Sequence, residues 1–174
     1  PPKISKAYKR SVVYTRDQLN SLDAYLVSEW SIHDIRMIPS LAFEGLTGTQ
    51  LNHLSPRSIR ALKPRQIGHF RDCVVEHLRA SRLELFSGRQ LKALGTKIST
   101  IKPNMMSGKS EYKLDLLKKM TTDQRKALTF EQVYELGRGI IEIKRGNNSR
   151  KQLEGLDDFI KQAEFIVDAI EGSG

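Results

Sequence analysis

Cysteine, aromatic residues and long apolar runs are all scarce in this sequence. Cys73 is the only cysteine among the 174 residues, so no disulfide can form within the chain. This suits a reducing cytoplasm or a secreted bacterial protein that does without disulfides. Phe, Trp and Tyr make up 7% of the residues, so we expect a core built mainly from Leu and Ile. No stretch approaches about 18 uninterrupted apolar residues, so we expect no transmembrane helix.

Signals of processing and of chemistry are equally sparse. The chain has no secretory apolar segment, and it opens on Pro1-Pro2-Lys3 without Met, which suggests a fragment or a processed chain. Gly137-Arg138-Gly139 has neither the preceding strand nor the spacing of a phosphate-binding loop. The carboxylate pairs Glu131/Glu135 and Asp157/Asp158 fall at expected helix starts or on a solvated face. We therefore predict a protein that is not an enzyme and needs no cofactor.

What the sequence does contain is a tandem octad between residues 47 and 70. Each octad has a capping or breaking residue pair, a polar pair, an aliphatic fifth residue and an apolar eighth residue. Ser or Thr can cap a helix, Pro fits its first position, and a Gln three residues after the cap can close a capping box. The two apolar residues share one face of a helix that is too short to be stable alone. The copies are TGTQLNHL at 47–54, SPRSIRAL at 55–62 and KPRQIGHF at 63–70.

Looser copies of the octad begin at Thr15, Ser87 and Thr129, and a poorer one at Thr121 has Arg125 in the aliphatic place. Strand-like alternation is almost absent. The sequence therefore predicts an all-α fold, a compact or superhelical stack of short helices with a few longer amphipathic helices. We expect the octads to be truly tandem only over residues 47–70.

The predicted organisation is a flexible basic lead followed by a single helical domain. The lead covers residues 1–10 and the domain covers residues 11–171. Within the domain we expect an octad core over 47–94, a loop over 96–110 and C-terminal helices over 111–171. The expected helices include Thr15 to about Trp30, a short helix within 31–41, a helix continuing from the third octad to about Arg82, one over 87–94 that ends at Gly95, one over 129–144 and one over about 150–170.

The run from Leu54 to Phe70 (LSPRSIRALKPRQIGHF) resembles the short helical repeats of mesothelin- and stereocilin-type superhelical proteins. It is equally similar to the LTPEQIxAL-style octads of some bacterial secreted proteins and effectors. The resemblance is firm over roughly 25 residues and implies a curved stack of short helices that binds other macromolecules. The chain departs from the mesothelin side because it is strongly basic and has no cysteine pairs.

Positive charge is concentrated in the middle of the chain. The formal net charge is +9, and residues 57–126 hold 17 Lys or Arg against 6 Asp or Glu, whereas residues 150–174 hold 3 against 6. Stacking of consecutive octads could align Arg57, Arg60 and Arg65 along one ridge. The alternative is an ordinary solvated face that maintains solubility. The full candidate binding surface is Arg57, Arg60, Arg65, Arg71, Arg79, Arg82, Arg89 and Lys92.

His69, Cys73 and His77 fall at intervals of four residues on the predicted helix that continues past Phe70. Residues four apart on a helix can share a metal ion, but the outer pair lies about 12 Å apart along the axis. A metal site is therefore not predicted, and we expect a buried Cys73 instead.

The leading functional hypothesis is a non-enzymatic interaction module that presents a basic surface to a protein partner. The alternative is a helical nucleic-acid-binding domain that uses the same surface, for which a steep fall of affinity with salt is expected. An acidic membrane surface stays open as a third kind of partner.

Overall fold

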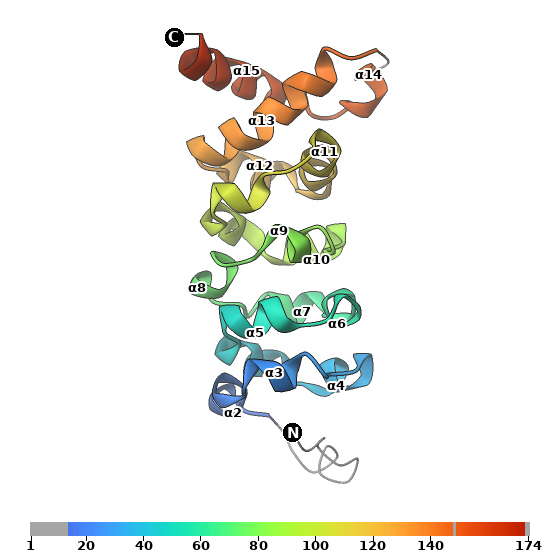
Figure 1. Cartoon of the computed structure of the whole chain (residues 1–174), viewed down its shortest axis with the longest axis vertical. Helices are drawn as coiled ribbons and strands as arrows, with labels where there is room; N and C mark the ends of the chain where they lie inside the picture. The colour runs from blue at the N-terminus through green and yellow to red at the C-terminus, as the bar shows by residue number, and fades with distance from the viewer. Residues whose placement is uncertain (1–13, 148, 173–174) are drawn as a thin grey trace. The chain divides into compact units, whose positions relative to one another are not determined.

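The computed structural model describes residues 14–147 and 149–172, which form helices and contain no β-strand. The all-α prediction is thus confirmed for this part of the chain (Figure 1). Residues up to Leu94 and residues from Gly95 onward make two compact units, whereas the sequence suggested one domain over residues 11–171. The predicted basic lead at residues 1–10 lies outside the described residues.

The first unit consists of short helices that follow one another every eight residues. They are α2 (Arg16–Ser21), α3 (Ala24–Val27), α4 (Ile32–Met37), the 3-10 helix η1 (Ser40–Gly45), α5 (Gly48–His53), α6 (Pro56–Ala61), α7 (Pro64–Ile67), α8 (Asp72–Val75), α9 (Ala80–Leu83) and α10 (Gly88–Ala93). The octad spacing therefore runs without insertion from Thr15 to Leu94, and the restriction of the tandem octads to residues 47–70 was wrong.

The core of the first unit is built from the fifth and eighth residues of the octads. The fifth residues are all fully buried, and they are Leu19, Val27, Ile35, Phe43, Leu51, Ile59, Ile67, Val75, Leu83 and Leu91. Of the eighth residues only Leu22 is not buried, and Phe70 and Phe86 are enclosed completely. Aliphatic side chains thus dominate this core. Each short helix contributes only one narrow apolar face to it.

Glutamine at the fourth octad position joins helices that are far apart in the sequence. The Gln50 amide oxygen accepts from the Thr47 backbone N–H at 3.0 Å, which closes the capping box of α5. The Gln50 amide nitrogen donates to the carbonyl oxygens of Leu19 and Leu22, both at 2.8 Å, at the C-terminal end of α2. Gln66 and Gln90 make the corresponding bonds to residues 31 and 28 positions earlier. These bonds satisfy carbonyls that a helix end leaves unpaired.

Two predicted long helices of the first unit are broken. Residues 15–30 form α2 and α3, which are separated by the extended residue Leu22 and by Asp23, the N-cap of α3. The third octad does not continue to Arg82, because α7, α8 and α9 are separate helices. Arg71 and Arg79 are extended N-cap residues between them and carry no side-chain cap, so the usual capping signal is missing at these breaks.

The second unit contains longer helices after two 3-10 helices. Its elements are η2 (Gly95–Thr100), η3 (Pro103–Met106), α11 (Ser110–Lys119), α12 (Thr122–Ala127), α13 (Phe130–Lys144), α14 (Ser149–Gln152) and α15 (Asp157–Glu171). Gly95, where the helix over 87–94 was expected to end, has a positive φ of 56°. The predicted loop over 96–110 was wrong in that η2 and η3 occupy much of it. The predicted final helix is interrupted: α14 ends at Gln152, and the turn that follows contains Gly155 with a positive φ of 83°.

Helix α13 packs against both α11 and α15. A Cβ atom on Gly137 would lie 2.8 Å from Cβ of Ala163 on α15. A Cβ atom on Gly139 would lie 2.6 Å from Cδ of Lys113 on α11. The two glycines that weaken the centre of this helix therefore allow it to approach a neighbour on each side.

The octad beginning at Thr121 retains its capping box although Arg125 replaces the aliphatic residue. The Arg125 guanidinium donates to the carbonyl oxygens of Leu117 at 3.1 Å and Met120 at 2.9 Å. Arg125 thus binds the last carbonyls of α11 instead of filling a core position.

Candidate macromolecule-binding surface

Two stretches of the first unit contain basic residues and no acidic residue. Residues 55–70 hold Arg57, Arg60, Lys63 and Arg65, and residues 85–94 hold Arg89 and Lys92; neither stretch has an Asp or Glu. Between them, residues 71–84 mix both signs of charge. In the sequence, residues 71–84 separate the two basic stretches.

Folding brings the two stretches together. The Gln90 amide nitrogen on α10 donates to the carbonyl oxygens of Ile59 at 2.8 Å and Leu62 at 2.9 Å, at the end of α6. Helix α10 also packs against α7. We call the resulting surface the basic face. It consists of the exposed side chains Arg57, Arg60, Lys63, Arg65, Arg89 and Lys92.

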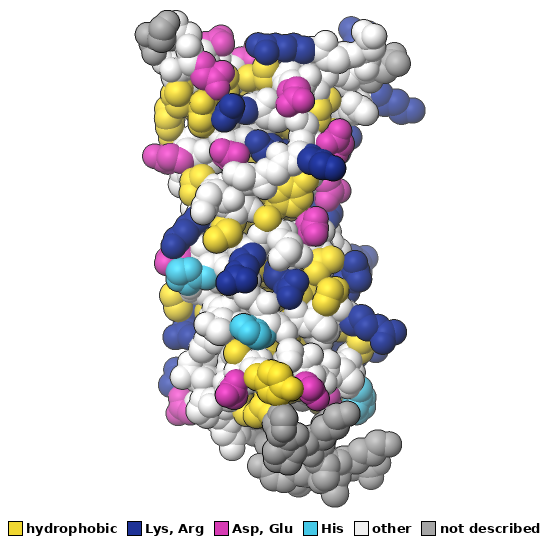
Figure 2. All heavy atoms as spheres, in the orientation of Figure 1, with side chains coloured by type: hydrophobic (Ala, Val, Ile, Leu, Met, Phe, Trp, Pro, Cys, Tyr) yellow, Lys and Arg dark blue, Asp and Glu magenta, His cyan; other side chains and the backbone are white. Residues whose placement is uncertain are grey.

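The cations of the basic face lack acidic partners. Among the ion pairs within 4.0 Å between described residues, none includes a member of this face. Lys63 makes a hydrogen bond from Nζ to the Arg36 carbonyl oxygen at 3.3 Å, which leaves its charge uncompensated. Figure 2 shows Lys and Arg side chains at the level of α6, α7 and α10, with few Asp or Glu between them on the face in view. These exposed cations form no ion pair within the part of the chain that the structure describes, and positive charge of this kind can attract anions.

The other three predicted site residues lie on different elements. Arg71 and Arg79 are the N-cap residues of α8 and α9, and Arg71 donates to the Leu46 carbonyl oxygen at 3.2 Å. Arg82 on α9 is only partly exposed, and its Nε atom is buried without a hydrogen-bond partner among the described residues. Asp72, Glu76 and Glu84 interrupt the positive charge here. The structure thus brings together Arg57, Arg60, Arg65, Arg89 and Lys92 of the predicted surface and not these three.

The sequence related the cations only through consecutive octads, and the structure adds contacts between octads further apart. Helices α6 and α7 follow each other at one level of Figure 1, whereas α10, three and four octads later, packs against α7 and donates a hydrogen bond to the end of α6 through Gln90. Helix α10 therefore adds the exposed residues Arg89 and Lys92 to the cations of the neighbouring α6 and α7. The sequence signal that would have found this face is the pair of acid-free stretches, which also includes the overlooked Lys63.

The residues of the rejected metal site are not on one helix. His69 follows the end of α7 and its Nδ1 lies 3.3 Å from Oε1 of Glu44. Cys73 lies on α8 and is exposed, so its predicted burial was wrong. His77 follows α8, with Nε2 at 3.3 Å from Oε1 of Glu76. Within the described residues no group of three or more His, Cys, Asp or Glu is placed to hold a metal ion.

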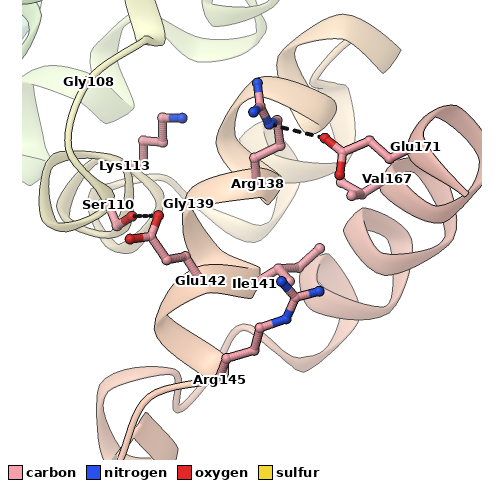
Figure 3. A pocket seen from close by; sticks show the side chains of 10 residues that line it. All are labelled: Gly108, Ser110, Lys113, Arg138, Gly139, Ile141, Glu142, Arg145, Val167 and Glu171. Atoms are coloured by element: carbon pink, nitrogen blue, oxygen red, sulfur yellow. Dashed lines mark hydrogen bonds and ion pairs between the residues drawn. The ribbon is translucent and has the colours of Figure 1, made fainter.

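A cavity of about 360 Å³ in the second unit is lined by several charged groups. Its polar groups bind one another (Figure 3): Ser110 Oγ donates to Glu142 Oε2 at 3.0 Å, and Arg138 Nε lies 3.2 Å from Glu171 Oε1. Tyr134 also donates to Glu171, at 2.9 Å, and this hydrogen bond is the main reason that the pKa of Tyr134 is raised.

Lys113 also lines this cavity, and its buried amine lies 3.3 Å from Oε1 of Glu135. Burial acts to raise the pKa of Glu135, but the hydrogen bond from Ser107 and the charge of Lys113 outweigh it, so the pKa is lowered overall. A carboxylate held in its ionised form in this way stabilises the fold and is a poor general base near neutral pH.

No protein-family model matches the sequence, and neither a curated protein nor a solved structure matches it. None of the helices in the described residues combines the length and the apolar character needed to cross a membrane.

Proposed function

We propose that this protein is a non-enzymatic interaction module whose stacked octads present the basic face to an acidic protein partner. The observation that carries the proposal is the joining of two acid-free stretches into one surface by the bonds of Gln90. Random placement of charge on a solvated surface would intersperse both signs, as residues 71–84 do. A superhelical array of short helices would hold such a surface rigid, and the resemblance to mesothelin- and stereocilin-type repeats favours the same role.

A nucleic-acid partner is the second candidate, because phosphates would also neutralise the exposed Arg and Lys side chains. The basic face has no exposed aromatic residue for base stacking, since Phe70 and Phe86 are both 0% exposed. This observation favours the protein partner over single-stranded nucleic acid.

The proposal is tested by affinity capture with the immobilised chain from nuclease-treated extract, followed by reconstitution with the purified partner. The variant Arg57→Glu/Arg65→Glu reverses charge on the basic face, and Arg71→Glu/Arg79→Glu makes the same net change on α8 and α9. We expect the first variant to lose the partner and the second to retain it. Equal retention by both variants would remove the basic face as the site, and capture that disappears with nuclease would favour nucleic acid.

A further inference from the structure

We propose that the ligand of the basic face is an extended acidic segment of the partner, with a carboxylate bridging Arg60 on α6 and Arg89 on α10. This inference rests on the proposed function and specifies the form of the partner. It follows from three features of α6, α7 and α10: the absence of apolar anchors, the small residues beside the cations, and the proximity of Arg60 to the helix that carries Arg89.

The basic face lacks the apolar residues of an interface between folded proteins. The large hydrophobic residues exposed in the described chain all lie on other elements, and they are Tyr25, Ile32, Met37, Leu41, Phe130, Phe165 and Ile170. Stable interfaces between folded domains depend on desolvated aromatic or aliphatic anchors surrounded by a polar rim. Binding at this face must therefore draw its free energy from charge pairs, which a flexible acidic segment can supply without an apolar core.

Small residues lie beside the cations in the sequence of these elements. Pro56, Gly68 and Gly88 are exposed, and Ala61 and Ala93 are partly exposed. A Cβ atom on Gly88 would meet no atom within 4 Å. Small side chains beside the Arg and Lys residues leave room for the main chain of a ligand, from which acidic side chains could reach the neighbouring guanidinium groups.

A hydrogen bond joins the backbone of Arg60 to α10, the helix that carries Arg89. The Gln90 amide nitrogen donates to the Arg60 carbonyl oxygen at 3.3 Å, so the residue that precedes Gln90 lies at the seam between α6 and α10. In the proposed complex the guanidinium groups of Arg60 and Arg89 converge on one carboxylate, whose negative charge offsets the repulsion between the two cations. A carboxylate can accept hydrogen bonds from both, and charge-assisted bonds of this kind are roughly twice as strong as neutral ones.

A peptide binding assay tests the extended-segment model. The probe is a fluorescein-labelled 16-residue peptide with Glu at alternate positions and Ser or Gly between them, and the reference peptide carries Gln in place of every Glu. Fluorescence anisotropy is measured with the whole chain over a series of salt concentrations. We expect binding of the Glu peptide only, with an affinity that falls steeply as salt increases.

The variant Arg60→Gln/Arg89→Gln should weaken binding of the Glu peptide at least about tenfold, because the bridged carboxylate loses both partners. The matched variant Arg71→Gln/Arg79→Gln removes the same charge from α8 and α9 and should change the affinity less than about threefold. Unchanged melting temperatures would show that both variants are folded. An equal loss in the two variants would refute the bridging role of Arg60 and Arg89.

Two further outcomes separate this inference from the proposed function. If Arg57→Glu/Arg65→Glu abolishes capture of the full partner and the Glu peptide fails to bind, the basic face stands and the extended segment is wrong. If a DNA duplex or single strand of equal charge binds more tightly than the peptide and shows the same loss with Arg60→Gln/Arg89→Gln, the ligand is nucleic acid and the acidic segment is refuted.

Discussion

The side-chain nitrogen of Gln66 lies 2.9 Å from the carbonyl oxygen of Ile35, which precedes it by 31 residues. The same amide donates to the Ile38 carbonyl oxygen at 3.0 Å, and its oxygen accepts from the Lys63 backbone N–H at 2.8 Å. One fully buried side chain therefore forms hydrogen bonds with backbone groups at the beginning of α7 and at the end of α4. The repeated glutamines connect local capping to tertiary packing in this way.

The variant Gln66→Ala should destabilise the first unit by about 2–4 kcal/mol, because it leaves two buried carbonyl oxygens and one backbone N–H without their partner. Urea unfolding followed by circular dichroism measures this change. Gln18 supplies the matched control, since it closes the capping box of α2 with Thr15, is exposed, and makes no bond to a distant carbonyl among the described residues. Gln18→Ala should cost only about 0.5–1 kcal/mol. Similar losses in both variants would contradict a role for the long-range bonds.

Arg82 occupies the octad position at which Gln50 and Gln90 stand. By the same spacing of 31 and 28 residues, a glutamine at this position would face the carbonyl oxygens of Leu51 and Leu54. The Arg82→Gln variant should therefore raise the free energy of unfolding by about 1 kcal/mol, since it replaces a buried unpaired Nε atom with a donor of the right length. The measured quantity is the urea midpoint. A lower midpoint would show that the aliphatic stem of Arg82 contributes more through packing than the amide would through hydrogen bonding.

The capping residues made the helical class and several helix starts predictable from the sequence. Thr15, Thr47, Ser87 and Thr129 each accept a hydrogen bond from the backbone of the glutamine three residues later, as expected of a capping box. The breaks after α7 and α8 could not be predicted in this way. Ile67, Phe70, Val74 and Leu78 fit one continuous amphipathic helix as well as they fit separate octads, and local spacing cannot decide between the two.

The basic face was predictable only in part for a related reason. The sequence shows which residues are charged, but the partner of α6 lies in an octad four places further on, and the bonds of Gln90 decide that pairing. Arg71 and Arg79 have the same chemistry as Arg57 and Arg89, yet they stand in octads that also hold Asp72, Glu76 and Glu84. Contacts between distant octads thus distinguish the two groups, and composition does not.

The stability of the protein should be sensitive to a single methyl group added at Gly137. In an exposed helix the change from Gly to Ala stabilises by up to about 1 kcal/mol. In Gly137→Ala the new Cβ atom would meet Cβ of Ala163 at 2.8 Å, so α13 and α15 must move apart, and a net loss of about 1–3 kcal/mol is expected. Gly88→Ala on α10 is the control, because its Cβ atom would meet nothing within 4 Å, and it should be neutral or stabilising. Thermal unfolding of both variants provides the comparison, and a stabilised Gly137→Ala variant would contradict close packing of α13 on α15.

Glu135 should contribute stability that depends on pH in a defined direction. Its carboxylate pairs with the buried amine of Lys113, and its side chain is 23% exposed. In Glu135→Gln the amide oxygen can still accept from Ser107, so the variant removes mainly the charge, and we expect a loss of about 2 kcal/mol at pH 7 because Lys113 stays buried without an anion.

The pKa of Glu135 is lowered in the folded protein from an ordinary value of 4.5. Folding therefore favours the ionised form, and the stabilisation is fully present above pH 4.5 and is lost as the pH falls through the lowered value. The difference in urea midpoint between the wild-type protein and Glu135→Gln should accordingly be constant near neutral pH and shrink toward zero in acid. Glu131→Gln, at an exposed position on the same helix, should differ from wild type by no more than about 0.5 kcal/mol. A difference for Glu135→Gln that persists unchanged at pH 3 would show that the shape of the side chain, and not its charge, stabilises the contact between α11 and α13.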